Sequence, residues 1–115
     1  MTHRKAIAAY KTILTMRNKI TGGTAFVLFG LKKKLQDVVD FQVEEEQKLI
    51  QKYDGKIGQN GMIDIPEDKR EAFAEDFEKI GSVECDIDPV HVPADSIPGI
   101  TLAEIEALDG FVIFD

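Results

Sequence analysis

The chain has little of what builds metal, disulfide or redox sites. It contains no tryptophan, one cysteine (Cys85) and two histidines, His3 and His91. A single cysteine cannot close an internal disulfide, and nothing in the cysteine content indicates an oxidising compartment. The two histidines are far apart in the chain and lack the short spacing of zinc ligands. We therefore expect no metal site and no cofactor.

Long hydrophobic runs are also missing. The longest, residues 25–31, has seven residues, whereas a helix that crosses a bilayer needs about 20. Basic residues precede this run, as they do in a signal peptide, but three lysines follow it and no small-residue cleavage site is present. These absences predict a cytoplasmic protein that makes no membrane contact.

Acidic residues are absent before Asp37, which follows eight basic residues. Residues 1–53 carry ten bases and five acids, a charge of +5, and residues 54–115 carry four bases and sixteen acids, a charge of −12; the sum is the net charge of −7. This sum argues against nucleic-acid binding by the whole chain, although the basic part alone could contact phosphates. The length predicts a single domain, 1–115, with a basic helical part (1–53) and an acidic α+β part (54–115).

The basic part is expected to form two helices. Apolar residues at helical spacing predict the first over 3–19, with Thr2 as its N-cap and a glycine pair that ends it. The second is expected over 25–53, about 29 residues and roughly 43 Å long. Its apolar seam has the spacing of heptads: Leu28, Leu31, Leu35 and Val38. So long a helix in a small domain must kink, extend past its own core or pair with another chain.

The acidic part is expected to alternate turns, short strands and helices. Residues 54–61 predict a turn or loop, with Gly55 left-handed at the end of the long helix. A strand over 61–65 is expected to pair with another over 82–88, and a helix that begins at Pro66 and ends at Gly81 crosses them. The three prolines between 89 and 98 predict an extended loop. Thr101 and Glu104 form a capping box that opens a helix to residue 108, before an apolar end at 111–114 that packs on the core or adds a third strand.

The predicted fold class is therefore α+β. Two N-terminal helices, the second one long, precede a small two- or three-stranded sheet with a crossing helix and a short C-terminal helix.

The order of these segments resembles a group of small proteins of tailed bacteriophages and prophages that have no assigned function. The segments that carry the resemblance are FQVEEEQKLIQKYDG (41–55), GMIDIPEDKREAFAEDFEKI (61–80), VECDID (83–88) and TLAEIEALDGFVIF (101–114). The resemblance covers roughly residues 20–115. It implies a viral or prophage origin and a cytoplasmic role in the infected bacterium, and it transfers no site residues.

One turn has features of an anion site. Exposed amides at a helix N-terminus, together with two nearby cations, can hold a phosphate or carboxylate. The candidate ligand residues are Arg17, Lys19, Thr21, Gly22, Gly23 and Thr24. The glycine spacing of a P-loop is missing. The alternative, which we favour, is a plain helix–helix turn.

No catalytic residue is predicted, and we expect the chain not to be an enzyme. Cys85 is expected to be a small buried apolar side chain, because burial and neighbouring carboxylates raise a thiol pKa. Glu84, Asp86, Asp88 and Asp95 could gather around a divalent cation, but a solvated acidic edge is the better interpretation.

The charges of the long helix predict a homodimer. Lysines near its start and glutamates near its end oppose the helix dipole, and an antiparallel copy would place one cluster against the other, crossing near Val38 and Val39. The charged residues of this interface are Lys32, Lys33, Lys34, Glu44, Glu45 and Glu46. Leu35, Val38, Val39 and Phe41 would supply the apolar contact. In the alternative, the first helix and the acidic part cover the lysines within one chain.

These features favour a non-enzymatic phage accessory protein that acts through protein–protein contact. It would be an assembly factor or an inhibitor of a host protein, with an unidentified host or phage partner. The alternative is a small anionic-ligand or nucleotide-binding protein that uses the Gly22-Gly23 turn to sequester a host defence signal.

Overall fold

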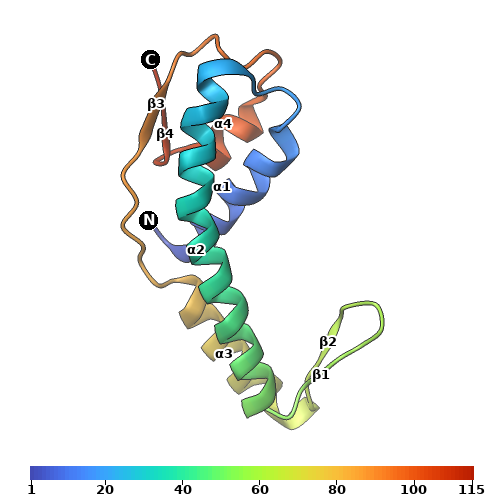
Figure 1. Cartoon of the computed structure of the whole chain (residues 1–115). Helices are drawn as coiled ribbons and strands as arrows, with labels where there is room; N and C mark the ends of the chain where they lie inside the picture. Colours follow the sequence, from blue (N-terminus) through green and yellow to red (C-terminus); the bar gives the residue numbers. More distant parts are fainter.

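A computed structural model describes all residues 1–115 as two lobes joined by one long helix (Figure 1). The molecule measures 51 × 29 × 22 Å, and its radius of gyration is 16.7 Å, compared with about 13 Å for a compact domain of this length. The elements in chain order are α1 (His3–Met16), α2 (Gly22–Lys52), β1 (Lys56–Ile57), β2 (Ile63–Asp64), the 3₁₀ helix η1 (Glu67–Lys69), α3 (Arg70–Gly81), β3 (Val90–Val92), α4 (Leu102–Leu108) and β4 (Val112–Phe114). The α+β fold class, with its long second helix, is confirmed.

The two N-terminal helices form an antiparallel hairpin. The Thr2 hydroxyl accepts from the Lys5 N–H and caps α1, as predicted. The glycine pair does not precede α2 but forms its first turn. Gly22 has φ 64°, which suits glycine because the residue lacks a Cβ. The helix therefore begins at Gly22, three residues before the predicted start at residue 25.

The head lobe comprises α1, the N-terminal half of α2, β3, α4 and β4. Its core is one cluster of twelve buried side chains: Ala6, Ala9, Ile13, Met16, Leu28, Leu31, Leu35, Val92, Ile97, Leu108, Phe111 and Val112. The heptad seam of the long helix supplies three of these. The capping box of α4 is present, since the Thr101 hydroxyl and the Glu104 carboxylate each accept a backbone N–H of the other residue.

The pairing of the strands differs from the prediction. Residues 82–88 form no strand and touch Thr2 through a single bridge at Glu84. β3 instead lies between Pro89 and Pro93, inside the predicted loop, and pairs in parallel with β4. The apolar C-terminal segment is the stronger partner because pairing with it buries Val92 and Val112 in the core. The result is two separate two-stranded sheets.

β2 pairs with β1 in a hairpin. The turn predicted over 54–61 is present around Gln59 and Asn60, but Lys56–Ile57 within that range form a strand. A local hairpin needs only a short loop to close, which costs little chain entropy. The left-handed residue at the end of α2 is Asp54, with φ 56°, and not Gly55. Glycine at position 55 avoids crowding instead: a Cβ there would overlap Ile65 Cδ1 and lie 3.2 Å from the Ile50 carbonyl oxygen.

The foot lobe comprises the C-terminal half of α2, the β1–β2 hairpin, η1 and α3. Its two buried aliphatic side chains are Ile50 and Ile65. Tyr53 meets Phe73 edge to face at a ring distance of 6.1 Å, and Phe73 lies 5.9 Å from Phe77. No helix in either lobe combines the length and apolar character needed to cross a bilayer.

Candidate interaction surfaces

An apolar groove lies at the end of the head where α1 and α2 meet. We call it the tip groove; its volume is about 220 Å³, and it is lined by Ile13, Leu14, Arg17, Ile20, Ala25, Leu28, Phe29 and Lys32. Six of these side chains are hydrophobic, and neither cation forms an ion pair within 4 Å. Acidic groups of another molecule that binds in this groove would therefore find two cations, Arg17 and Lys32, with which to pair.

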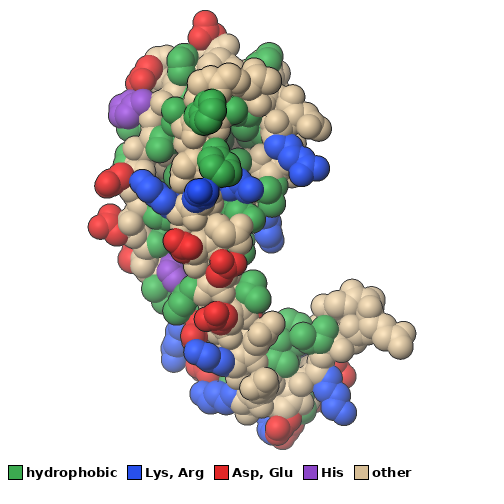
Figure 2. Space-filling view, in the orientation of Figure 1, with side chains coloured by type: hydrophobic (Ala, Val, Ile, Leu, Met, Phe, Trp, Pro, Cys, Tyr) green, Lys and Arg blue, Asp and Glu red, His purple; other side chains and the backbone are tan.

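Exposed aromatic side chains lie next to the groove. Phe26 is strongly exposed, and the Lys33 ammonium stands 4.9 Å over the ring of the half-exposed Phe29. Figure 2 shows hydrophobic side chains at the surface of this part of the head, with a cluster of basic side chains directly below them. Sequence reasoning missed this surface because it followed the heptad seam. The signal was present in Phe26 and Phe29, two large apolar side chains that lie outside the seam.

The predicted anion-site residues do not converge around the Gly22-Gly23 turn. Lys19 turns toward the C-terminal segment, where its ammonium lies 3.0 Å from Glu104 Oε1 and 3.2 Å from the Gly99 carbonyl oxygen. Arg17 lines the tip groove instead. Thr24 is buried, and Thr21 makes no side-chain cap to the helix. The nucleotide-binding alternative stays a prediction, and this geometry adds nothing to it.

The residues predicted to form the α2 dimer interface are divided between core and surface. Leu35 has no exposed surface, and Val38 packs against the core of the head. Leu35 is therefore unavailable to a second chain, which corrects its assignment to the interface. Val39 is half-buried, whereas Phe41 is exposed and meets His3 edge to face at a ring distance of 5.4 Å.

The charged residues of the same prediction are spread around α2. Lys33 and Glu44 share its exposed face, whereas Lys32 lines the tip groove. Lys34 is exposed; Glu45 pairs with Lys48 at 3.0 Å, and Glu46 accepts from Gln42. An antiparallel crossing near 38–39 would also bring Asp37 against Asp40 of a second chain, and like charges that face each other repel. The antiparallel helix pair stays a prediction, with a smaller apolar contact than the sequence suggests.

The β1–β2 hairpin projects from the foot as an arm (Figure 1). Ile57 and Ile63 are cross-strand partners, so their side chains share one face of the hairpin. Ile65 continues this face into the buried contact with Ile50 and Gly55. Ile57 is 59% and Ile63 41% exposed. An apolar stripe thus begins in the foot and runs out into solvent. Sequence reasoning missed it because it predicted a turn or loop over 54–61 and no strand at Lys56–Ile57.

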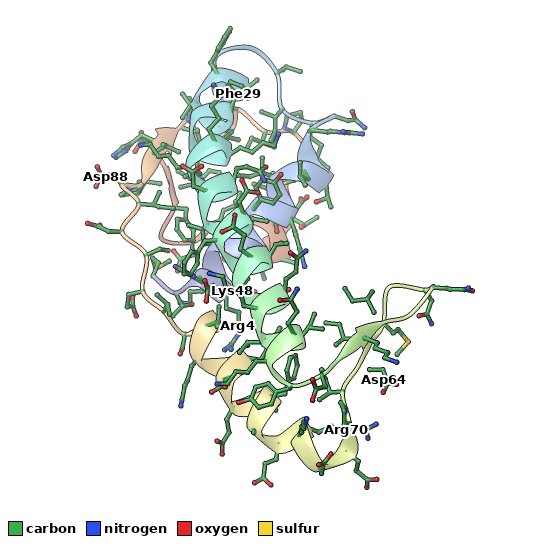
Figure 3. All side chains as sticks on the ribbon, turned by 60° about the horizontal axis from the view of Figure 1, so that its bottom comes forward. Arg4, Phe29, Lys48, Asp64, Arg70 and Asp88 are labelled. Atoms are coloured by element: carbon green, nitrogen blue, oxygen red, sulfur yellow. The ribbon has the colours of Figure 1, made fainter.

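The waist between the lobes contains two buried polar atoms without hydrogen-bond partners, His3 Nδ1 and Gln42 Oε1. Gln42 lines a small pocket of about 180 Å³ with Arg4 and Phe77. Arg4, which Figure 3 labels above the end of α3, pairs with Glu78 at 2.8 Å and ties α1 to α3. Gln42 occupies the seam position at which the heptad pattern turns polar, so the break in the pattern marks the waist.

The remaining chemistry-bearing residues lie apart. Cys85 is half-buried against the head core, and this burial raises the pKa of its thiol, as expected. His91 is exposed on β3, with Nδ1 3.1 Å from Asp115 Oδ1. No three carboxylate, imidazole or thiol side chains come close enough to hold a metal ion. Glu84, Asp86, Asp88 and Asp95 are all exposed.

In comparisons with known proteins, no protein-family model, no curated protein and no solved structure matches this chain.

Proposed function

We propose that this chain is a non-enzymatic accessory protein of phage or prophage origin that acts through protein–protein contact in the bacterial cytoplasm. It works as an assembly factor or as an inhibitor of a host protein, and its partner is a host or phage protein. The origin and the compartment rest on the resemblance of the segments over 20–115 to small phage proteins.

The observation that carries the proposal is the apolar stripe of the arm. A contiguous exposed apolar surface on a projecting element marks a protein contact. An isolated two-stranded hairpin is only marginally stable in water, so exposing Ile57 and Ile63 on one has a cost that a partner would offset. Lys56 and Asp64, paired across the same strands, give the opposite face of the arm charges that would orient it.

The test is affinity capture with the full chain as bait, from a lysate of the bacterium that carries the gene, followed by mass spectrometry. The variant is Ile57→Ser combined with Ile63→Ser, and the matched control is Gln59→Ser, an exposed polar residue in the loop of the same arm. We expect a protein that the wild type and the control recover and the arm variant loses. Recovery of nothing but the bait, or equal recovery by all three, would overturn the proposal.

A further inference from the structure

The tip groove has the size of a side-chain socket. Pockets for small molecules usually measure about 300–1,000 Å³, which is larger than its volume of about 220 Å³. One or two aliphatic side chains would fill such a space. Arg17 and Lys32 are unpaired, so the segment that brings those side chains must also bring carboxylates.

The same chain presents such a segment on the outer face of α4. Leu102 is 72% exposed and Ile105 is 38% exposed. Helical spacing places Leu102, Ile105, Glu106 and Asp109 on one side of this short helix, and Leu108 points to the core from the other. Two apolar side chains flanked by two carboxylates complement a groove with six apolar side chains and two cations.

The groove and the outer face of α4 cannot meet within one chain. Glu106 and Asp109 lie beside Lys5 and Ala8 of α1, whereas the groove uses Leu14 and Arg17 of the same helix. Leu14 is nine residues after Lys5, and Arg17 nine after Ala8. At about 100° per residue, nine residues are about half a turn of the helix wheel apart. The two complementary surfaces therefore lie on opposite sides of α1.

We propose that copies of this chain associate head to tail, with the outer face of α4 of one copy docked in the tip groove of the next. This inference is independent of the proposed function, because it uses neither the arm nor an outside partner. Because such a contact joins two different surfaces, each bound copy can bind a further one. The copies then form either a closed ring or an open filament. A seven-residue helix covers less than the roughly 1,000 Å² of a stable interface, so the association is weak and grows with concentration.

Charge reversal on each surface separately tests the proposal. The groove variant is Arg17→Glu with Lys32→Glu, and the helix variant is Glu106→Lys with Asp109→Lys. Sedimentation velocity of the full chain over a wide range of concentration is expected to show growing species for the wild type and monomers for each variant. A one-to-one mixture of the two variants is expected to associate again and to grow as the wild type does. The reversed α4 face of one variant matches the reversed groove of the other, and the two unchanged surfaces still match each other.

A second variant guards against a loss of fold. Leu102→Ser with Ile105→Ser changes exposed side chains only and is expected to abolish association without changing the far-UV circular dichroism. Lys11→Glu with Lys34→Glu is the matched control, since both residues are exposed lysines outside the groove, and it is expected to associate as the wild type does. A wild type that stays monomeric at every concentration, or a mixture in which no dimer forms, would overturn the head-to-tail contact.

Discussion

The two ends of α2 are stabilised by different means. In the head, α2 contributes Leu28, Leu31 and Leu35 to a single core of twelve side chains drawn from three helices, a parallel strand pair and the segments that connect them. In the foot, the same helix meets one partner helix through a row of aromatic rings, beside a few ion pairs. Stability depends mainly on buried apolar area. We infer that the foot opens locally well before the head unfolds.

The chain offers one optical reporter for each lobe. It has no tryptophan and only two tyrosines. Tyr10 bonds Gln36 across α1 and α2 in the head, and Tyr53 donates to Asp76 in the foot. A Tyr10→Phe background leaves a single tyrosine signal that reports on the foot.

The largest expected effect is on the head. Leu31→Ala removes a side chain with no exposed surface, and such cavities cost about 2–5 kcal/mol of unfolding free energy. Urea denaturation followed by circular dichroism measures the loss. Val43→Ala, at a half-exposed site on the same helix, is the control and is expected to change stability by less than about 0.5 kcal/mol. Equal losses in the two variants would contradict a core concentrated in the head.

The next effect separates the foot from the head. Gly55→Ala would force a Cβ against Ile65 and Ile50, and overpacking of this kind costs about 1–3 kcal/mol. In the Tyr10→Phe background, Tyr53 fluorescence is expected to show that the foot unfolds at a lower urea concentration. The Leu31 amide in the head is expected to keep its hydrogen-exchange protection. Gly30→Ala is the matched control, because nothing lies within 4 Å of its added Cβ and alanine in a helix gains about 0.5–1 kcal/mol. If the foot of Gly55→Ala unfolds at the same urea concentration as that of the wild type, the side chains around residue 55 move aside without a measurable loss of stability.

A smaller effect is expected at the capping box of the head. Thr101→Ala removes the hydroxyl that accepts the Glu104 N–H, and losing such a cap costs about 1 kcal/mol. Urea denaturation measures the change. Thr15→Ala removes an exposed hydroxyl from the last turn of α1 and is expected to be neutral or slightly stabilising, since alanine is the better helix former. If both substitutions have the same effect, the box adds nothing beyond ordinary helix propensity.

Local sequence signals predicted the helices well and the strand pairings poorly. The Thr2 cap, the Thr101–Glu104 box and the Leu28–Leu31–Leu35 seam are short-range patterns, and each appears in the structure. The pairing of β3 with β4 joins segments about twenty residues apart, so no local pattern distinguishes it from the predicted pairing of 62–65 with 82–88.

The surfaces were harder to predict than the fold for a related reason. The tip groove forms where the packing of α1 against α2 brings Leu14 beside Phe29. Lys19 appeared to belong to an anion site until the fold placed Glu104 beside it. Sequence spacing reports neighbours along one helix, whereas these contacts are set by the packing of different elements.

The smallest expected effect concerns the ion pairs of the foot. The Tyr53 hydroxyl, which donates to Asp76, and the Lys52 ammonium at 3.3 Å hold the pKa of Asp76 below its ordinary value. A carboxyl with a depressed pKa in the folded state contributes stability above its ordinary pKa of about 3.9, and this is lost as the pH falls through the lower, folded value. In the Tyr10→Phe background, Asp76→Asn is therefore expected to weaken the foot near neutral pH and to flatten its acid transition. Glu75→Gln, which removes an exposed carboxylate outside any ion pair, is the control and is expected to leave the acid transition of the foot unchanged. If Asp76→Asn shows the same acid transition as the wild type, other carboxylates cause that transition.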